Sequence, residues 1–281
     1  MSTRYLCILL MLSAALLSAC GSTPKSTTSS MDMHHGAMSM SGMTDAIGTK
    51  AEDGTYSLKL LTPKIKSTSG VVRFRIVDTK NQPLRDYQVE TTRKLHFIVV
   101  RRDFSLYQHL HPTLASDGTW SVKASFPTPG VYRVLADFTP TGDMKHVLAD
   151  NLQVGDGQYT ARTIYEPVSS ENVDGFSVRM TAEGLESGKA GTIALHISKG
   201  GETPQLEPYL GSRGHGVVLR SPDFAYLHVH PSDPQATADN LSFEVTLPTK
   251  AIYVAYVQFQ VAGKVHTAIF TLDARTGRVD L

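Results

Sequence analysis

The chain contains itself twice, at an interval of about 120 residues, and this repeat limits the folds that it can adopt. The stretch LHFIVVRRDFSLYQHLHP at 95–112 matches GHGVVLRSPDFAYLHVHP at 214–231. FPTPGVYRVLADF at 126–138 matches LPTKAIYVAYVQF at 247–259 in the same order. The two copies are therefore predicted at residues 54–155 and 174–275, with a linker at 156–173.

Each copy has the pattern of β structure. Residues 56–60 and 71–76 alternate between apolar and polar side chains, which is the period of a half-buried strand. Asp117-Gly118 and Pro129-Gly130 are turn signals between such stretches. About seven strands in about 100 residues are typical of an immunoglobulin-like or cupredoxin-like β-sandwich. We therefore expect an all-β protein with two tandem β-sandwiches.

Four histidines recur at matching positions of the two copies. The first copy holds His96, His109, His111 and His146, at intervals of 13, 2 and 35 residues. The second copy holds His215, His228, His230 and His266, at intervals of 13, 2 and 36 residues. Such recurrence favours a shared role for the matched positions.

The spacing of the paired histidines predicts their geometry. Residues i and i+2 of a strand point to the same face, so His109 and His111 lie side by side, and His228 lies beside His230. The other histidines come from separate strands and can close a pocket of three or four imidazoles. Such a set suits Cu(II), Zn(II) or Ni(II), and copper binds more tightly than zinc at equal geometry. We therefore predict one His metal site in each domain.

Several of these residues have a structural alternative. His96, His146, His215 and His266 can instead orient the paired histidines through hydrogen bonds. His196 has no counterpart in the first copy and is predicted to be structural. Asp103 and Asp223 fall one position out of register and are predicted to be turn residues.

The N-terminus has the pattern of an export signal. Arg4 precedes an apolar run that is too short for a stable membrane span. The run ends in Leu17-Ser18-Ala19-Cys20, which resembles a bacterial lipobox and implies removal of residues 1–19 and acylation of Cys20. The alternative is ordinary secretory cleavage nearby, which leaves Cys20 free. The resemblance implies a lipid-anchored protein of the cell envelope on the periplasmic face, and Gly21 favours the outer membrane in a Gram-negative cell.

Composition narrows the ligand chemistry. The 27 Lys and Arg residues nearly balance the 26 Asp and Glu residues, which argues against a nucleic-acid partner. Cys7 and Cys20 are the only cysteines of the chain, and Cys7 leaves with the signal. Metal ligands in the two domains must therefore be His, Met or carboxylate.

Residues 20–53 are predicted to be a flexible tether, because they are rich in Ser, Thr and Gly and lack apolar periodicity. Soft and borderline ligands gather within it: Met31, Met33, His34, His35, Met38, Met40 and Met43. Thioether sulfur selects Cu(I), and Ag(I) with it, so this Met/His tract predicts a soft-metal site. It resembles the Met/His tracts of bacterial copper-resistance proteins. The alternative is a linker in which methionine has gathered by accident.

HLHP in the first copy, and YLHVHP with PYLGSRGH in the second, resemble a family of secreted bacterial proteins with tandem β domains. The resemblance covers most of residues 54–275 and implies a heavy-metal or copper association without enzymatic activity. The chain departs from copper chaperones with a His-Met, Met and His-x-Met site, because no Met lies beside His111 or His230.

Three classes of function follow from these patterns. The first is a lipid-anchored protein for copper sequestration, transfer or resistance, with Zn(II) or Ag(I) as alternative ions and a copper efflux or acceptor protein as a partner. The second is a structural or adhesion module of the envelope, in which the histidines only hydrogen-bond. The third is a copper-dependent redox enzyme with Tyr107 or Tyr226 as a redox partner. No motif names a general base or a nucleophile, so we expect a binding protein and not an enzyme.

Overall fold

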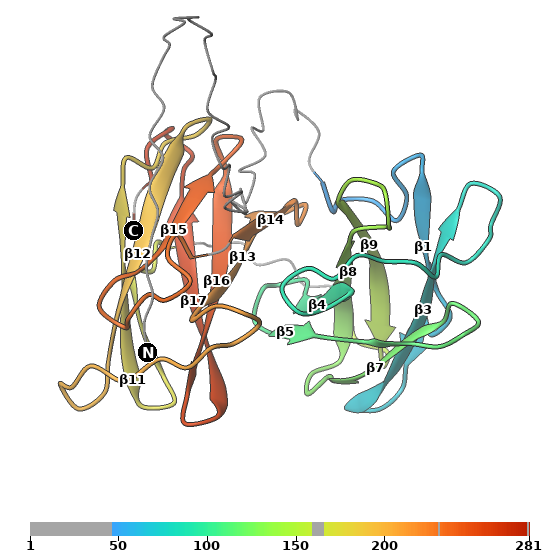
Figure 1. Cartoon of the computed structure of the whole chain (residues 1–281), viewed down its shortest axis with the longest axis horizontal. Coiled ribbons are helices and arrows are strands. Elements are labelled where there is room, and N and C mark those ends of the chain that lie inside the picture. The colour runs from blue at the N-terminus through green and yellow to red at the C-terminus, as the bar shows by residue number, and fades with distance from the viewer. Residues whose placement is uncertain (1–46, 159–165, 230, 280) are drawn as a thin grey trace, which may run out of the picture. The chain divides into compact units, whose positions relative to one another are not determined.

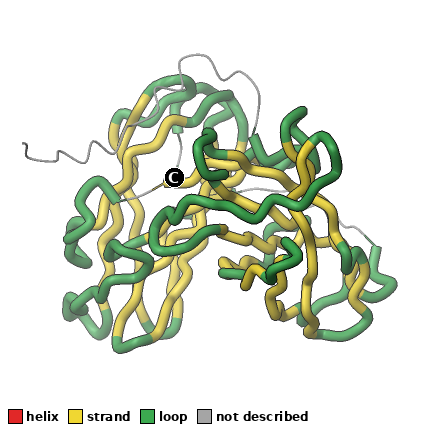
Figure 2. Tube along the Cα trace, turned by 45° about the vertical axis from the view of Figure 1, so that its right-hand side comes forward, coloured by secondary structure: helices red, strands yellow, loops and turns green. Residues whose placement is uncertain are grey.

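The computed structural model describes residues 47–158, 166–229, 231–279 and 281. These residues form strands, turns and loops, and no helix occurs among them (Figure 2). The described part therefore holds no helix that is long and apolar enough to cross a membrane.

The first repeat is a sandwich of two sheets (Figure 1). One sheet has the order β1-β3-β7-β6, and the other has the order β2-β9-β8-β4-β5. The strands are β1 (Tyr56–Leu60), β2 (Lys64–Ile65), β3 (Ser69–Asp78), β4 (Leu95–Arg101), β5 (Tyr107–Leu110), β6 (Thr113–Leu114), β7 (Trp120–Ser125), β8 (Gly130–Phe138) and β9 (His146–Val154).

The second repeat has the same two-sheet plan. Its sheets have the orders β10-β11-β12-β15 and β14-β13-β16-β17. The strands are β10 (Ser170–Val173), β11 (Phe176–Glu183), β12 (Ala190–Ser198), β13 (His215–Ser221), β14 (Tyr226–Val229), β15 (Leu241–Thr246), β16 (Ile252–Val261) and β17 (Lys264–Asp273). The prediction of an all-β chain with two tandem sandwiches is confirmed. Strand β10 falls within the 156–173 segment that was expected to be a linker.

Alternation along the strands builds one apolar core inside each sandwich. In β3, Val72, Phe74 and Ile76 are buried, whereas Val71 and Arg73, which alternate with them, are exposed. Phe74 stacks on Phe97 of the facing sheet at a centroid distance of 4.6 Å. The second core gathers equivalent residues around Val178, Phe243 and Phe259. Packing of inward side chains from two sheets is what stabilises a sandwich of this kind.

The sheets that contain β8 and β16 are apolar on both faces, which a half-buried sheet is not. Nearly every residue of these two strands is buried. A third apolar cluster contains outer-face residues of both repeats, and Phe104 stacks on Phe224 within it at 4.4 Å. The outer faces of the two sheets therefore form an interface between the repeats. We call it the inter-repeat interface.

The residues that lead into β1 belong to this interface. Ile47 packs on the third apolar cluster, and its carbonyl accepts a hydrogen bond from the backbone N–H of Tyr226 (3.0 Å). Gly48 has φ +74°, and a Cβ there would lie 2.9 Å from atoms of both Val147 and Tyr226. A larger residue would therefore push the repeats apart.

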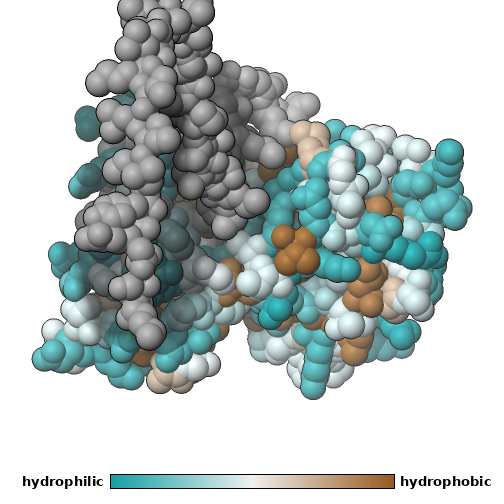
Figure 3. Space-filling view, in the orientation of Figure 1, coloured by the Kyte–Doolittle hydropathy of each residue, from teal (hydrophilic) through white to brown (hydrophobic). Residues whose placement is uncertain are grey.

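The visible coloured surface is mostly hydrophilic, with separate hydrophobic spots (Figure 3).

Candidate metal centre

Three buried histidines from both repeats converge at the inter-repeat interface. Ligand nitrogens of His96, His109 and His215 all lie within 4.8 Å of one another. The ring of His109 lies 4.8 Å from that of His215, and the ring of His96 lies 5.6 Å from it. Two more histidines lie next to His96: the ring of His111 is 5.3 Å from its ring, and the ring of His228 is 5.4 Å from it. We call these five residues the histidine cluster.

Strand register explains why these side chains meet. In β4, His96 has the same parity as Ile98 and Val100, which belong to the third apolar cluster. His215 has the same parity as Val217 and Leu219 in β13. Because alternate residues share a face, both histidines point toward the other repeat. The cluster is thus a polar end of an otherwise apolar interface.

His109 is held from one side by the second repeat. Its Nδ1 lies 2.9 Å from Oε1 of Gln258 on β16, whose amide nitrogen donates to Thr267. The other nitrogen, Nε2, lies 2.9 Å from Nδ1 of His96. Burial lowers the pKa of His109 to about 3, so its imidazole is neutral near pH 7. A neutral imidazole is the form that binds metals.

His228 belongs to the second repeat and is held by a residue of the first repeat, whereas His109 belongs to the first and is held by the second. Its Nδ1 lies 2.7 Å from Oδ2 of Asp137 on β8, and its Nε2 lies 2.6 Å from Nε2 of His215. The buried carboxylate of Asp137 also accepts a hydrogen bond from the Tyr226 hydroxyl (2.9 Å) and pairs with Lys145 (3.3 Å). Burial works against the charged form of Lys145, but attraction to Asp137 and Glu90 raises its pKa. The positive charge of Lys145 therefore balances the negative charge of the Asp137 carboxylate inside the interface.

His96 can adopt either tautomer. Its Nε2 lies 3.2 Å from the carbonyl oxygen of Glu90 and 2.8 Å from the hydroxyl of Thr91. A carbonyl only accepts, whereas a hydroxyl both donates and accepts. Donation to Glu90 leaves a lone pair on Nδ1 toward His109, and acceptance from Thr91 leaves a proton there. Burial lowers the pKa of His96, which disfavours a proton on both nitrogens.

His109 and His111 lie side by side, as their spacing predicts, with ring centroids 4.8 Å apart. Nε2 of His111 is buried without a hydrogen-bond partner among the described residues. Burial lowers the pKa of His111 to about 4. The ring of His111 is therefore neutral near pH 7, and its Nε2 has no hydrogen-bond partner within the described part of the chain. His230 lies outside the described residues.

The prediction of one site inside each domain stays untested, because His230 lies outside the described residues, but the three histidines that converge do not all come from one domain. The group of three combines His96 and His109 of the first repeat with His215 of the second. Matching sequence positions led us to expect two separate pockets. Instead the matched positions face each other, because the two repeats dock through equivalent sheet faces. Sequence spacing within one copy cannot show this docking.

The prediction that His146 and His266 close the pocket is wrong. His146 has the parity of Leu148 and Leu152, which pack inside the first sandwich, opposite to the face of His96. Its Nδ1 lies 2.6 Å from Oδ2 of Asp53. His266 likewise faces its own sandwich core and lies 2.7 Å from Oδ2 of Asp174. Both histidines pack on aromatic rings of their own sandwiches.

The predicted soft-metal and lipid sites cannot be placed. Met31, Met33, His34, His35, Met38, Met40, Met43 and Cys20 lie outside the described residues. The expectation for the two predicted turn residues is met. Asp103 and Asp223 accept backbone hydrogen bonds from Ser105 and Ala225, as turn residues do. His196, which was predicted to be structural, is exposed and pairs with Asp239.

Asp137 and Gln258 were not predicted as residues of the site. These residues occupy the same position of the repeat, and in each sheet they are register partners of the first histidine: His96 with Asp137, and His215 with Gln258. Their signal was available, because each is a polar residue within a long apolar strand. A polar side chain at such a position needs a buried partner.

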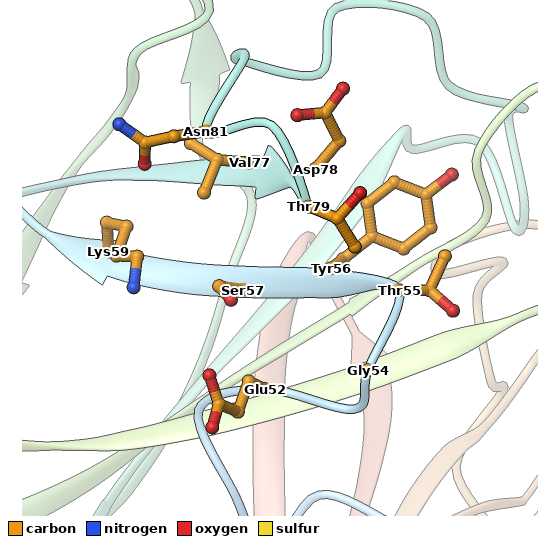
Figure 4. Close-up of a pocket in the computed structure, with 10 residues that line it drawn as sticks. All are labelled: Glu52, Gly54, Thr55, Tyr56, Ser57, Lys59, Val77, Asp78, Thr79 and Asn81. Carbon is orange, nitrogen blue, oxygen red and sulfur yellow. The ribbon is translucent and has the colours of Figure 1, made fainter.

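A surface pocket lies elsewhere, beside β1 and the end of β3 (Figure 4). Its lining includes Glu52, Tyr56, Lys59 and Asp78, and no histidine. This pocket is therefore separate from the histidine cluster and offers no comparable set of ligands.

Comparison with known proteins identifies the repeat unit. The sequence profile of a family described as "Domain of unknown function (DUF8832)" matches residues 49–154 and again residues 171–276. Among curated proteins, none matches this sequence.

Solved structures with tandem β domains align with the chain at low similarity. A biofilm-associated protein, the BSP domain, shares 16% identity over 79% of this chain and 30% of its own, with a TM-score of 0.24. A tetra-tandem repeat from the extending region of a large adhesion protein shares 11% identity over 79% of this chain and 50% of its own, with a TM-score of 0.27. Fibronectin(III)-like modules of Clostridium thermocellum CbhA share 11% identity over 76% of this chain and 90% of their own, with a TM-score of 0.22. The chain spans half or less of the first two, and these scores are too low to support any inference about action.

Proposed function

This chain belongs to the family described as a domain of unknown function (DUF8832), and we propose that it binds a transition-metal ion at its histidine cluster. The observation that carries the proposal is the convergence of His96, His109 and His215 with their ligand nitrogens within 4.8 Å. Protein acceptors on the far side of the rings support it. A metal-binding histidine characteristically donates its other N–H to a carboxylate or carbonyl, which fixes the tautomer and aims the lone pair.

The hydrogen bonds aim lone pairs into the cluster. Donation to Gln258 by Nδ1 of His109 leaves Nε2 with a lone pair, and donation to Glu90 by His96 does the same for its Nδ1. The two nitrogens lie 2.9 Å apart, and in this arrangement their lone pairs repel each other. A cation relieves the repulsion, and the lowered pKa values disfavour a proton in that role. A metal ion fits the electrostatics better.

The distances fit a first-row transition ion after a small adjustment. Metal–imidazole bonds of about 2.0–2.1 Å in a tetrahedral site place two ligand nitrogens about 3.4 Å apart. Nδ1 of His96 and Nε2 of His109 lie 2.9 Å apart, and the ligand nitrogens of the group of three all lie within 4.8 Å of one another, so these limits bracket that value. Rotamer adjustments of under about 1 Å suffice. The site holds only nitrogen donors in its group of three, which suits Cu(II) and Zn(II) and does not suit Mg(II) or Ca(II).

We propose copper as the principal ion, within a lipid-anchored envelope protein for copper sequestration, transfer or resistance. The Irving–Williams order favours Cu(II) over Zn(II) at equal geometry. The Met/His tract at residues 31–43 supplies soft ligands for Cu(I) or Ag(I) on the same chain. The lipobox-like Cys20 supplies the anchor, and an efflux or acceptor protein would receive the ion. No part of this role is enzymatic.

The test is metal analysis of protein purified without a His-tag. The protein used for the test has every Met of residues 31–43 replaced by Leu and every His there replaced by Ala, so that only the folded repeats can bind the ion. Wild-type repeats should retain one equivalent of Cu(II) after desalting. The double variant H109A/H215A should retain none, whereas the exposed control H196A should match wild type. Equal retention by all three proteins would contradict the proposal.

A structural envelope module is the second candidate, and Thr91 favours it. If Thr91 donates to Nε2 of His96, then Nδ1 of His96 donates to His109, and His109 donates to Gln258. That chain of hydrogen bonds is complete without an ion. Nitrogen-15 NMR of His96 in metal-free protein distinguishes the two tautomers. A proton fixed on Nδ1, together with failure to retain metal, would establish the structural role.

A further inference from the structure

We propose that an ion at the histidine cluster clamps the two repeats together, so that metal binding and docking of the repeats form one coupled equilibrium. This inference rests on the proposed function and adds a regulatory consequence to it. The ligands come from β4 and β5 of the first repeat and from β13 of the second. Separation of the repeats therefore splits the group of three.

Hydrogen bonds that cross the interface strengthen the coupling. Asp137 of the first repeat holds His228 of the second, and Gln258 of the second repeat holds His109 of the first. The two bonds are equivalent under exchange of the repeats, since Asp137 and Gln258 occupy matching register positions. Each repeat thus orients a histidine that it does not itself contain. Neither repeat alone has the oriented set.

The apolar part of the interface docks the repeats without an ion. Phe104 stacks on Phe224 with a 5° interplanar angle, and Tyr107 stacks on Tyr256 at 4.2 Å. An ion therefore acts on an interface that is already formed, and its effect is to make opening rarer. By linkage, a ligand that binds only the docked state lowers the opening constant by a factor of 1 + [L]/Kd, which is about 100 at a concentration of 100 Kd.

Two amides can report this opening, one in each repeat. The N–H of Ala149 donates to the carbonyl of Lys50 (2.7 Å), and the N–H of Tyr226 donates to that of Ile47 (3.0 Å). Both acceptors belong to the 47–50 segment, and its Gly48 fits between Val147 and Tyr226. Opening of the inter-repeat interface releases this segment and exposes both amides to exchange.

The experiment is amide hydrogen exchange by NMR, on the chain with a silenced 31–43 tract, with and without Zn(II). Zinc is chosen because it is diamagnetic. At 100 Kd of free Zn(II), exchange at both Ala149 and Tyr226 should slow by up to about 100-fold. Amides within each sandwich, such as Phe126 (bonded to Thr68) and Ile197 (bonded to Ala238), should change far less. The H196A control should behave as wild type, and H109A/H215A should show no zinc effect.

The outcomes separate the clamp from the site itself. If calorimetry under the same conditions detects no Zn(II) binding, and no Cu(II) is retained either, the proposed function fails. If Zn(II) binds with one equivalent but slows exchange at Ala149 alone, or at neither reporter amide, the site stands and the clamp is wrong. Slowing at both reporters, lost in H109A/H215A, supports the clamp.

Discussion

The two faces of the sheet that contains β4, β8 and β9 carry histidines with opposite roles. His96 and His109 lie on the outer face, where their rings meet His215 of the second repeat. His146 lies on the inner face, with its Nδ1 on Asp53 and its ring stacked on Phe138. All three recur in the second copy at matching intervals. Recurrence in sequence therefore marks a position that the fold needs, and only the face of the strand decides what it is needed for.

Removal of outer-face and inner-face histidines should separate binding from stability. In chelator competition with Cu(II), H109A/H215A should lower the affinity by on the order of 10³-fold, because two of three converging nitrogens are lost. The inner-face double variant H146A/H266A should stay within about threefold of wild type while it is folded. A comparable loss from the inner-face pair would mean that the two faces share one site.

Stability should show the reverse order. His146→Ala removes a buried hydrogen bond to a carboxylate and the packing of a ring against Tyr56 and Phe138. We expect a loss of about 2 kcal/mol in the free energy of unfolding, measured by urea denaturation of metal-free protein. His196→Ala, which truncates an exposed histidine, should change it by less than about 0.5 kcal/mol. An equal effect of both variants would remove the structural role of His146.

The sequence predicted the fold well and the site in part, for one reason. Strands, turns and the paired His109 and His111 follow from local periodicity, and the structure has them as expected. The face of a strand relative to a partner sheet depends on tertiary docking. His146 and His96 lie on opposite faces, and no local pattern fixes their relative parity because 50 residues and the four strands β5, β6, β7 and β8 separate them.

A cue to the docking was present in the strand compositions. Strands β8 and β16 are apolar at both parities, which predicts burial on both faces. In such a strand, Asp137 and Gln258 are conspicuous as polar residues. Had these observations been combined, they would have predicted a second partner for the outer face, and a polar contact within it. They would not have shown that the partner is the other repeat.

Asp137 and Gln258 also make the two halves of the cluster unequal. A carboxylate holds His228 and a neutral amide holds His109. Asp137→Asn should lower the affinity for Cu(II) by about tenfold, since removal of a group that orients a metal-bound histidine costs about 10- to 100-fold. Asp150→Asn on the neighbouring β9 is the matched control and should leave affinity unchanged. An unchanged affinity in D137N would mean that His228 lies outside the ligand set.

The smallest expected effect is a pH dependence that belongs to the outer face. The pKa of His109 is about 3 when folded and about 6.5 when unfolded, so the unfolded chain takes up the proton first as the pH falls. Its contribution to stability is thus complete above the unfolded pKa and is lost progressively between about pH 6.5 and pH 3. From pH 7.5 to pH 6.0, this histidine alone should cost about 0.8 kcal/mol in metal-free protein. His109→Gln, compared with wild type by urea denaturation at both pH values, should show a smaller decrease by that amount. An identical pH dependence in both proteins would mean that folding leaves the pKa of His109 at its ordinary value, and the argument that burial keeps protons out of the cluster would lose its basis.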